Sequence, residues 1–154
     1  MPKLLAGSQT TKSMSNQEQI EQLIRGQEQA VQQKNIDGAM DHYATDVVSF
    51  DVVNTLQKVG IQACQERLES WLAQFPETFS YAIETLSVVA NDELGFGYSF
   101  NHVNGLLANG DEIDMRWRST VCLRKQSGQW LITHEHSSVP FDAQSGQALT
   151  KLEA

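Results

Sequence analysis

The residues with the greatest chemical capacity lie near the end of the chain, where His134, His136 and Ser138 occupy alternate positions. A strand sends alternate side chains to opposite faces, so these three are expected on one face, with Trp130 and Ile132 behind them. Such a strand is typical of one wall of a pocket with a polar end. The imidazoles can act as acid/base groups or as polar anchors for a ligand. Alternatively, they are structural and donate to a neighbouring strand or to a subunit interface.

Asp51 is the candidate carboxylate. It closes a predicted strand over residues 47–52, on the same face as Val47 and Ser49. A carboxylate placed by a strand can act as a general base toward a C–H group or water. Alternatively, Asp51 caps a turn or lies in solvent.

Metal ligands are the next possibility, because two histidines two residues apart on a strand can chelate. A zinc site needs three or four ligands, however. The further candidates, His102 and Asp51, are not placed near His134 and His136 by the sequence. We therefore predict no metal site and no cofactor.

The whole-chain totals favour one ordinary domain. The chain has 154 residues with 40% hydrophobic residues, and no run is apolar enough to span a bilayer. A formal charge of −8 argues against nucleic acid as a partner, because binding phosphates needs a basic surface. Cys64 and Cys122 lie far apart with no metal-type spacing, which favours inert reduced thiols in a cytoplasmic protein.

Helices are predicted in the first half of the chain. Ser15 and Glu18 form a capping box that opens a helix extending to about Lys34. A short second helix is expected over residues 39–43, and a third over residues 61–74, before Pro76. Short strands over residues 47–52 and 56–59 separate the second helix from the third.

The second half of the chain predicts four long strands. The first two cover residues 79–90 and 94–107, and Asn109-Gly110 is a strong hairpin signal. The last two lie within residues 111–138, joined by a turn at Ser127-Gly128. Helices followed by strands indicate an α+β fold, in which about three helices pack on a curved, mostly antiparallel sheet and enclose a pocket in a cone. We expect a flexible leader at 1–14, the domain at 15–140 and a tail at 141–154.

Two segments resemble a known superfamily, the SnoaL-like or ketosteroid-isomerase-like proteins, also named after nuclear transport factor 2. QKNIDGAMDHYATDVVSFD resembles the family's helix–break–helix–strand opening. SGQWLITHEHSSVP is similar to the end of the calcium/calmodulin-dependent kinase II association domain, in which Gly-x-Trp precedes His-x-His-x-Ser. The resemblance covers about residues 17–140. It implies the fold but not one function, because this scaffold hosts isomerases, dehydratases, cyclases and assembly domains.

The resemblance to ketosteroid isomerase can be followed residue by residue. The aspartate base of that enzyme corresponds to Asp51, and its oxyanion-hole tyrosine corresponds to Gln27. Its second, protonated acid corresponds to Ser119 or Thr120. Losing one oxyanion donor typically costs about a hundred- to a thousandfold in rate, so the resemblance argues against steroid isomerisation here.

The association domain implies a different site, a pocket lined by arginines that binds small acids. Arg116 and Arg118 lie on the corresponding strand, and the sequence leaves open which face they occupy. Arg118 can pair with a ligand carboxylate through its planar fork or form an ion pair with Asp114 or Glu112. The candidate ligand-binding residues are Tyr43, Trp71, Phe100, Arg118, Thr120 and Ser138.

Two functional hypotheses follow. The first is a metal-free acid/base enzyme of isomerase, lyase or hydrolase type that uses Asp51 and one of His134 and His136 on a small organic molecule. The second is a non-catalytic binding or assembly domain for small carboxylates, with Arg116 or Arg118 on the ligand and Asp51 turned away. In either case we expect a homodimer, because the outer face of the sheet carries apolar residues that need cover.

Overall fold

The computed structural model describes residues 13–153 and confirms the α+β architecture. The elements in chain order are α1 (Asn16–Gln32), α2 (Ile36–Met40), β1 (Tyr43–Phe50), β2 (Lys58–Val59), α3 (Ile61–Leu72), β3 (Ser80–Ala90), β4 (Leu94–Leu106), β5 (Glu112–Gln126) and β6 (Gln129–Ser138). The predicted leader lies mostly outside the described residues. No helix among residues 13–153 has the length and apolarity needed to cross a membrane.

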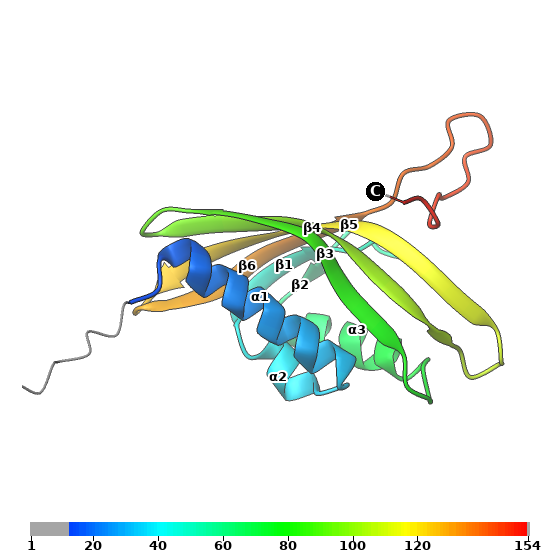
Figure 1. Cartoon of the computed structure of the whole chain (residues 1–154), viewed down its shortest axis with the longest axis horizontal. Coiled ribbons are helices and arrows are strands. Elements are labelled where there is room, and N and C mark those ends of the chain that lie inside the picture. Colours follow the sequence, from blue (N-terminus) through cyan, green and yellow to red (C-terminus); the bar gives the residue numbers. More distant parts are fainter. Residues whose placement is uncertain (1–12, 154) are drawn as a thin grey trace, which may run out of the picture.

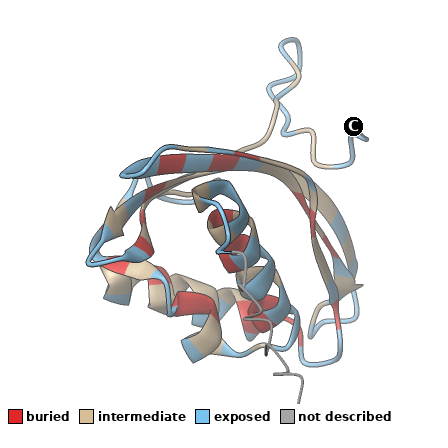
Figure 2. Ribbon diagram, turned by 60° about the vertical axis from the view of Figure 1, so that its left-hand side comes forward, coloured by how far each residue is buried: buried red, intermediate tan, exposed pale blue. Residues whose placement is uncertain are grey.

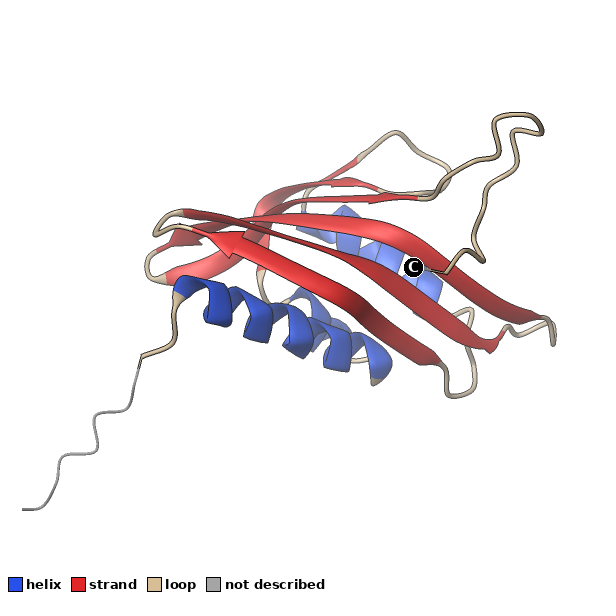
Figure 3. Ribbon diagram, turned by 45° about the horizontal axis from the view of Figure 1, so that its top comes forward, coloured by secondary structure: helices blue, strands red, loops and turns tan. Residues whose placement is uncertain are grey.

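The six strands form one sheet in the order β2-β1-β6-β5-β4-β3. All neighbouring strands are antiparallel except β1 and β6, which are parallel. The sheet curls around the three helices, which all lie on its inner face (Figures 1 and 3). The predicted cone of helices on a curved sheet is therefore confirmed.

The second helix lies three residues earlier than predicted, at Ile36–Met40 rather than 39–43. The Asn35 side chain accepts a hydrogen bond from the Gly38 N–H at 3.1 Å, and this N-cap starts the helix there. Strand β1 then begins at Tyr43, a residue that the sequence assigned to the helix.

Helix α1 packs very closely on the sheet. Its buried residues are drawn red in Figure 2. Among them, Ile20 and Ile24 face β4, where Gly95 and Gly97 leave room for them. A Cβ at Gly95 would lie 2.5 Å from Ile20 Cδ1, and one at Gly97 would lie 2.9 Å from Ile24 Cδ1. The two glycines therefore set the distance between the helix and the sheet.

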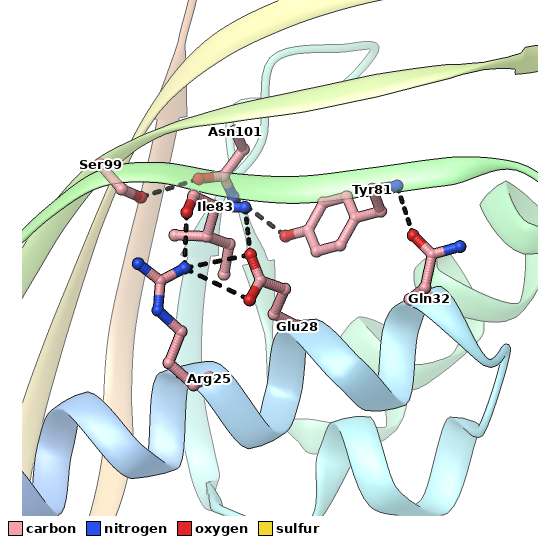
Figure 4. A network of polar contacts seen from close by, with 7 residues as sticks. All are labelled: Arg25, Glu28, Gln32, Tyr81, Ile83, Ser99 and Asn101. Carbon is pink, nitrogen blue, oxygen red and sulfur yellow. Dashed lines mark hydrogen bonds and ion pairs between the residues drawn. The ribbon is translucent and has the colours of Figure 1, made fainter.

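Polar side chains of α1 also bond the backbone of β3, which is an edge strand of the sheet (Figure 4). Glu28 accepts from the Ile83 N–H, and the Gln32 Oε1 accepts from the Tyr81 N–H at 2.6 Å. Arg25 donates to the Ile83 carbonyl at 2.6 Å. The helix thus satisfies edge groups that a further strand would otherwise pair.

A β-bulge in β6 controls which residues face the helices. Leu123 of β5 pairs with Ile132, whereas the preceding residue of β5 pairs with His134, so Thr133 is an extra residue. A bulge of this kind interrupts the alternation of a strand. Ile132 is buried in the core, and Glu135 lies on the same inner face three residues later.

The tail folds back on the sheet. Phe141 and Ala148 form an isolated β-bridge, and the Asp142 carboxylate accepts from two backbone N–H groups of the turn between them. The Thr150 carbonyl then accepts from the Arg116 N–H at 2.8 Å. This bond lies on the part of β5 that β6 leaves unpaired beyond Arg118.

Candidate functional site

A cavity of about 480 Å³ lies between the inner face of the sheet and the helices. Its lining is mostly apolar and includes Leu68, Trp71, Tyr81, Ile113, Met115 and Trp117. Trp71 packs edge-on against Trp117, with ring centroids 6.1 Å apart. A space of this size and composition fits a small, largely apolar organic molecule.

Glu135 of β6 is the central polar group of the cavity wall. Its Oε2 accepts from the Tyr43 hydroxyl at 2.6 Å, and its Oε1 accepts from Ser49 Oγ at 3.0 Å. Ser49 and Glu135 are direct neighbours in the parallel β1–β6 pair. Burial raises the pKa of the Glu135 carboxyl, and the two hydroxyl donors offset part of that rise.

Tyr43 connects Glu135 to helix α1. Its hydroxyl accepts from Gln27 Nε2 at 2.9 Å while it donates to Glu135. Burial and the neighbouring Glu135 carboxyl raise the pKa of Tyr43 well above its ordinary value. The phenol therefore stays protonated and acts as a fixed donor that orients the carboxyl.

Asp51 is the second carboxylate of the cavity wall. It directly follows the end of β1 and forms an ion pair with Arg67 of α3, with Nε and Oδ2 2.6 Å apart. Its other oxygen accepts from the Val52 N–H at 2.6 Å. Both side chains of the pair are partly exposed, so the cavity holds one charged pair and one carboxyl withdrawn from water.

Cys64 also faces the cavity, from α3. Burial and the nearby Glu135 raise the pKa of its thiol to about 11. The thiol is therefore protonated at neutral pH and a poor nucleophile. This state agrees with the inert thiol that the sequence predicts.

Three of the predicted site residues line the cavity, namely Tyr43, Asp51 and Trp71. The others lie on the outer face of the sheet, and the expectation that they line the pocket is wrong. These residues are His134, His136, Ser138, Phe100, Arg118 and Thr120.

The physical reason for this correction differs between strands. In β6 the bulge at Thr133 shifts the alternation, so the two histidines and Ser138 turn outward. In β5 the phase that contains Met115 and Trp117 occupies the inner face, which sends Arg116 and Arg118 outward. The sequence leaves open which face of the sheet Arg116 and Arg118 occupy, and in the structure it is the outer face.

The outward residues have structural partners. His134 Nδ1 donates to the Val48 carbonyl at 2.7 Å, and the His136 ring packs edge-on against Phe50. Arg118 donates to Ser138 Oγ at 3.1 Å rather than pairing with an acid. Asp51 lines the cavity, whereas the binding-domain hypothesis expects it turned away, and that part of the hypothesis is wrong.

The sequence reasoning missed Glu135, Arg67 and Tyr81. Arg67 lies one helical turn before Trp71, and that spacing could have placed both on the same wall. Glu135 carries no such signal, because strict alternation assigns it to the face opposite Ile132. Among residues 13–153, no three histidine, cysteine or acidic side chains gather closely enough to hold a metal ion.

Comparisons with known proteins agree with this geometry. Residues 20–142 match the SnoaL-like domain family. An NTF2-like protein of unknown function from Pseudomonas putida KT2440 is 31% identical, with a TM-score of 0.82 over 92% of this chain and 100% of that chain. No curated protein sequence matches the chain.

Two more distant structures show the fold alone. A Xanthomonas campestris protein that bears the name of the calcium/calmodulin-dependent protein kinase II association domain is 21% identical, with a TM-score of 0.67 over 86% of this chain and 87% of its own. A Shewanella frigidimarina protein named as a ketosteroid isomerase is 19% identical, with a TM-score of 0.64 over 76% of this chain and 92% of its own.

The curled sheet, the three helices and the enclosed cavity define a pocket protein of the NTF2-like class. Within that class, the chain belongs to the SnoaL-like domain family.

Proposed function

We propose that this protein is an acid/base enzyme that transfers a proton on a small, largely apolar organic molecule. Glu135 is the proton-transfer group in this proposal, and Tyr43 and Ser49 position its carboxyl. The Asp51–Arg67 pair supplies a second carboxylate on the same cavity wall. The reaction is then of isomerase or lyase type, in which one carboxyl group accepts a proton from the substrate and one returns a proton to it.

The environment of Glu135 is the observation that carries the proposal. A proton-transfer group works best when its pKa lies near the working pH, and burial raises the pKa of Glu135 toward that range. Two hydroxyl groups fix the carboxyl at 2.6 and 3.0 Å. A carboxyl that is both buried and oriented, in a cavity large enough for a ligand, is typical of a catalytic site.

The differing surroundings of the two carboxyl groups further support the proposal. Asp51 has a guanidinium at 2.6 Å, whereas Glu135 has only hydroxyl donors. Paired acids in unlike environments can divide the roles of acid and base between them.

Deuterium exchange tests the proposal even when the product of the reaction is unidentified. The full chain is incubated in D₂O with a panel of ketones, esters and nitroalkanes, and loss of the acidic C–H signal is followed by NMR. We expect exchange faster than in buffer for at least one compound. We expect Glu135→Gln to slow it by about a hundred- to ten-thousandfold, since the amide cannot accept or return a proton.

His136→Gln is the matched control, because it changes a titratable side chain of the same strand on the outer face. It should leave the exchange rate unchanged. A Glu135→Gln variant that exchanges as fast as the wild type contradicts the proposal. Loss of exchange in His136→Gln contradicts it as well.

A non-catalytic carboxylate-binding domain is the second candidate. Two cationic side chains on the cavity wall, Arg67 and Lys58, favour it. The exchange experiment separates the two candidates if thermal melting with small carboxylates is recorded on the same samples. Stabilisation that depends on Arg67, without exchange of any compound, supports the binding domain.

A further inference from the structure

Tyr81 occupies a special position in the cavity wall. It lies on the inner face of β3, and its ring packs against two tryptophans of the cavity wall. The Trp71 ring centroid is 6.0 Å away and the Trp117 centroid is 6.2 Å away. Together the three rings form an aromatic cluster on the cavity wall, against which an apolar group can pack.

The Tyr81 hydroxyl is oriented by two polar residues of β4 (Figure 4). Ser99 Oγ donates to Asn101 Oδ1 at 2.8 Å, and Asn101 Nδ2 donates to the Tyr81 hydroxyl oxygen at 3.0 Å. Asn101 is only 7% exposed, so this series of hydrogen bonds is held in the protein interior. Because the hydroxyl oxygen already accepts a hydrogen bond, its own hydrogen must point elsewhere.

No acceptor for that hydrogen is found among residues 13–153. Burial raises the pKa of Tyr81, with a smaller contribution from the nearby Glu135 and Glu28 carboxyl groups. The phenol therefore remains protonated at any physiological pH. The hydroxyl faces the cavity, where a ligand that supplies an acceptor gains a hydrogen bond from it.

The charges around the hydroxyl select the kind of acceptor. The charged groups that act on Tyr81 are the acids Glu135 and Glu28, and both disfavour negative charge there. Of the two cations on the cavity wall, Arg67 and Lys58, Arg67 is paired with Asp51 at 2.6 Å. An uncharged oxygen, such as a carbonyl, fits this position better than a carboxylate.

We infer that Tyr81 binds the carbonyl oxygen of an uncharged ligand whose flat apolar part packs against Trp71 and Trp117. The inference rests on the proposed function in one respect, namely that the same cavity holds the ligand. The inference restricts the ligand class to neutral carbonyl compounds. Tyr81 determines that preference, and Asn101 and Ser99 orient its hydroxyl.

Fluorescence titration with two matched probes tests the inference. The first is 6-propionyl-2-(dimethylamino)naphthalene, a ketone, and the second is its 6-propyl analogue without the carbonyl. We expect Tyr81→Phe to weaken binding of the ketone by about five- to tenfold and to leave binding of the analogue unchanged, since a single neutral hydrogen bond is lost.

Tyr98→Phe is the matched control, because it removes the same hydroxyl from a tyrosine that is exposed on the outer face. It should bind both probes as the wild type does. Equal affinity of Tyr81→Phe and wild type for the ketone overturns the inference. An equal loss of affinity for both probes also overturns it, because such a loss reflects packing alone.

The infrared carbonyl stretch of the ketone bound to wild type provides a second test that needs no variant. We expect it at lower frequency than in a hydrocarbon solvent, as for a hydrogen-bonded carbonyl. A stretch at the hydrocarbon value overturns the inference even if Tyr81→Phe fails to fold. Binding that prefers the ketone, without deuterium exchange of any compound, would support this inference and contradict the proposed function. Deuterium exchange without a preference for the ketone would support the proposed function and contradict this inference.

Discussion

At the scale of single residues, the chemistry of the cavity depends on Thr133. This extra residue of β6 places Glu135 among the inward side chains and turns His134 and His136 outward. A carboxyl then occupies the position in which the sequence suggests imidazoles. Tyr43 and Ser49 both donate to it, which indicates that the site is built around this acid.

The raised pKa of Glu135 predicts a pH-dependent stability. Above its ordinary value of 4.5, the unfolded chain loses the proton while the folded protein still holds it. The stability that this group contributes is therefore complete below that pH and is lost as the pH rises through the folded pKa. Glu135→Gln cannot ionise, so its free energy of unfolding should rise relative to wild type as the pH rises above 4.5.

Urea denaturation across that pH range measures this difference. Glu93→Gln, in the exposed turn before β4, is the matched control for the loss of one carboxyl group. An identical pH trend in both variants would show that the effect comes from net charge and not from the burial of Glu135.

At the scale of elements, helix α1 does more than cover the cavity. It replaces a missing neighbour of β3 through Arg25, Glu28 and Gln32, all on one side of the helix (Figure 4). An unprotected edge strand is a site of unwanted pairing with other chains. Gln32 of this glutamine-rich helix therefore has a structural role, because it bonds the edge of the sheet.

Glu28→Ala tests this protection. Removing the carboxylate leaves the Ile83 N–H without its acceptor, and we expect a loss of about 1–3 kcal/mol in the free energy of unfolding. Hydrogen exchange should show faster exchange of the Ile83 amide in particular. Glu21→Ala is the control, since Glu21 forms a bond within its own helix, accepting from Gln17 Nε2 at 3.3 Å. Unchanged protection of Ile83 in Glu28→Ala would contradict the edge-capping role.

At the scale of the whole molecule, the three helices all lie on the inner face of the sheet and leave its outer face without helical cover (Figure 1). Large apolar side chains remain exposed there, and Phe96 and Tyr98 stack with ring centroids 6.4 Å apart. An apolar patch on an antiparallel sheet is commonly buried by a second copy about a twofold axis.

We therefore predict a homodimer that pairs through this outer face. Light scattering should give twice the mass of the chain for the wild type, and Phe96→Glu should give a monomer. Leu56→Glu is the control, because Leu56 is 95% exposed on the loop before β2, away from the patch. A wild-type protein that scatters as a monomer would refute the prediction.

Much of the fold could be predicted from local sequence signals. The Ser15 cap, the apolar spacing of α1 and the turns at Asn109-Gly110 and Ser127-Gly128 each act within a few residues of the chain. The positions of Asp51 and Trp71 on the cavity wall also follow from simple alternation and helical spacing. These features depend on neighbours in the sequence, and the sequence therefore determined them by itself.

The candidate site depends on tertiary structure. Glu135 faces inward because β6 must match β5 and β1 on its two sides, and the extra residue at Thr133 absorbs the mismatch. Tyr81 and Arg67 meet the same cavity only because the sheet curls over α3. Pairing between distant strands is fixed by long-range packing. The local pattern of residues 129–138 indicates an unbroken strand and gives no sign of the bulge. Only the folded structure therefore decided which polar groups share the cavity.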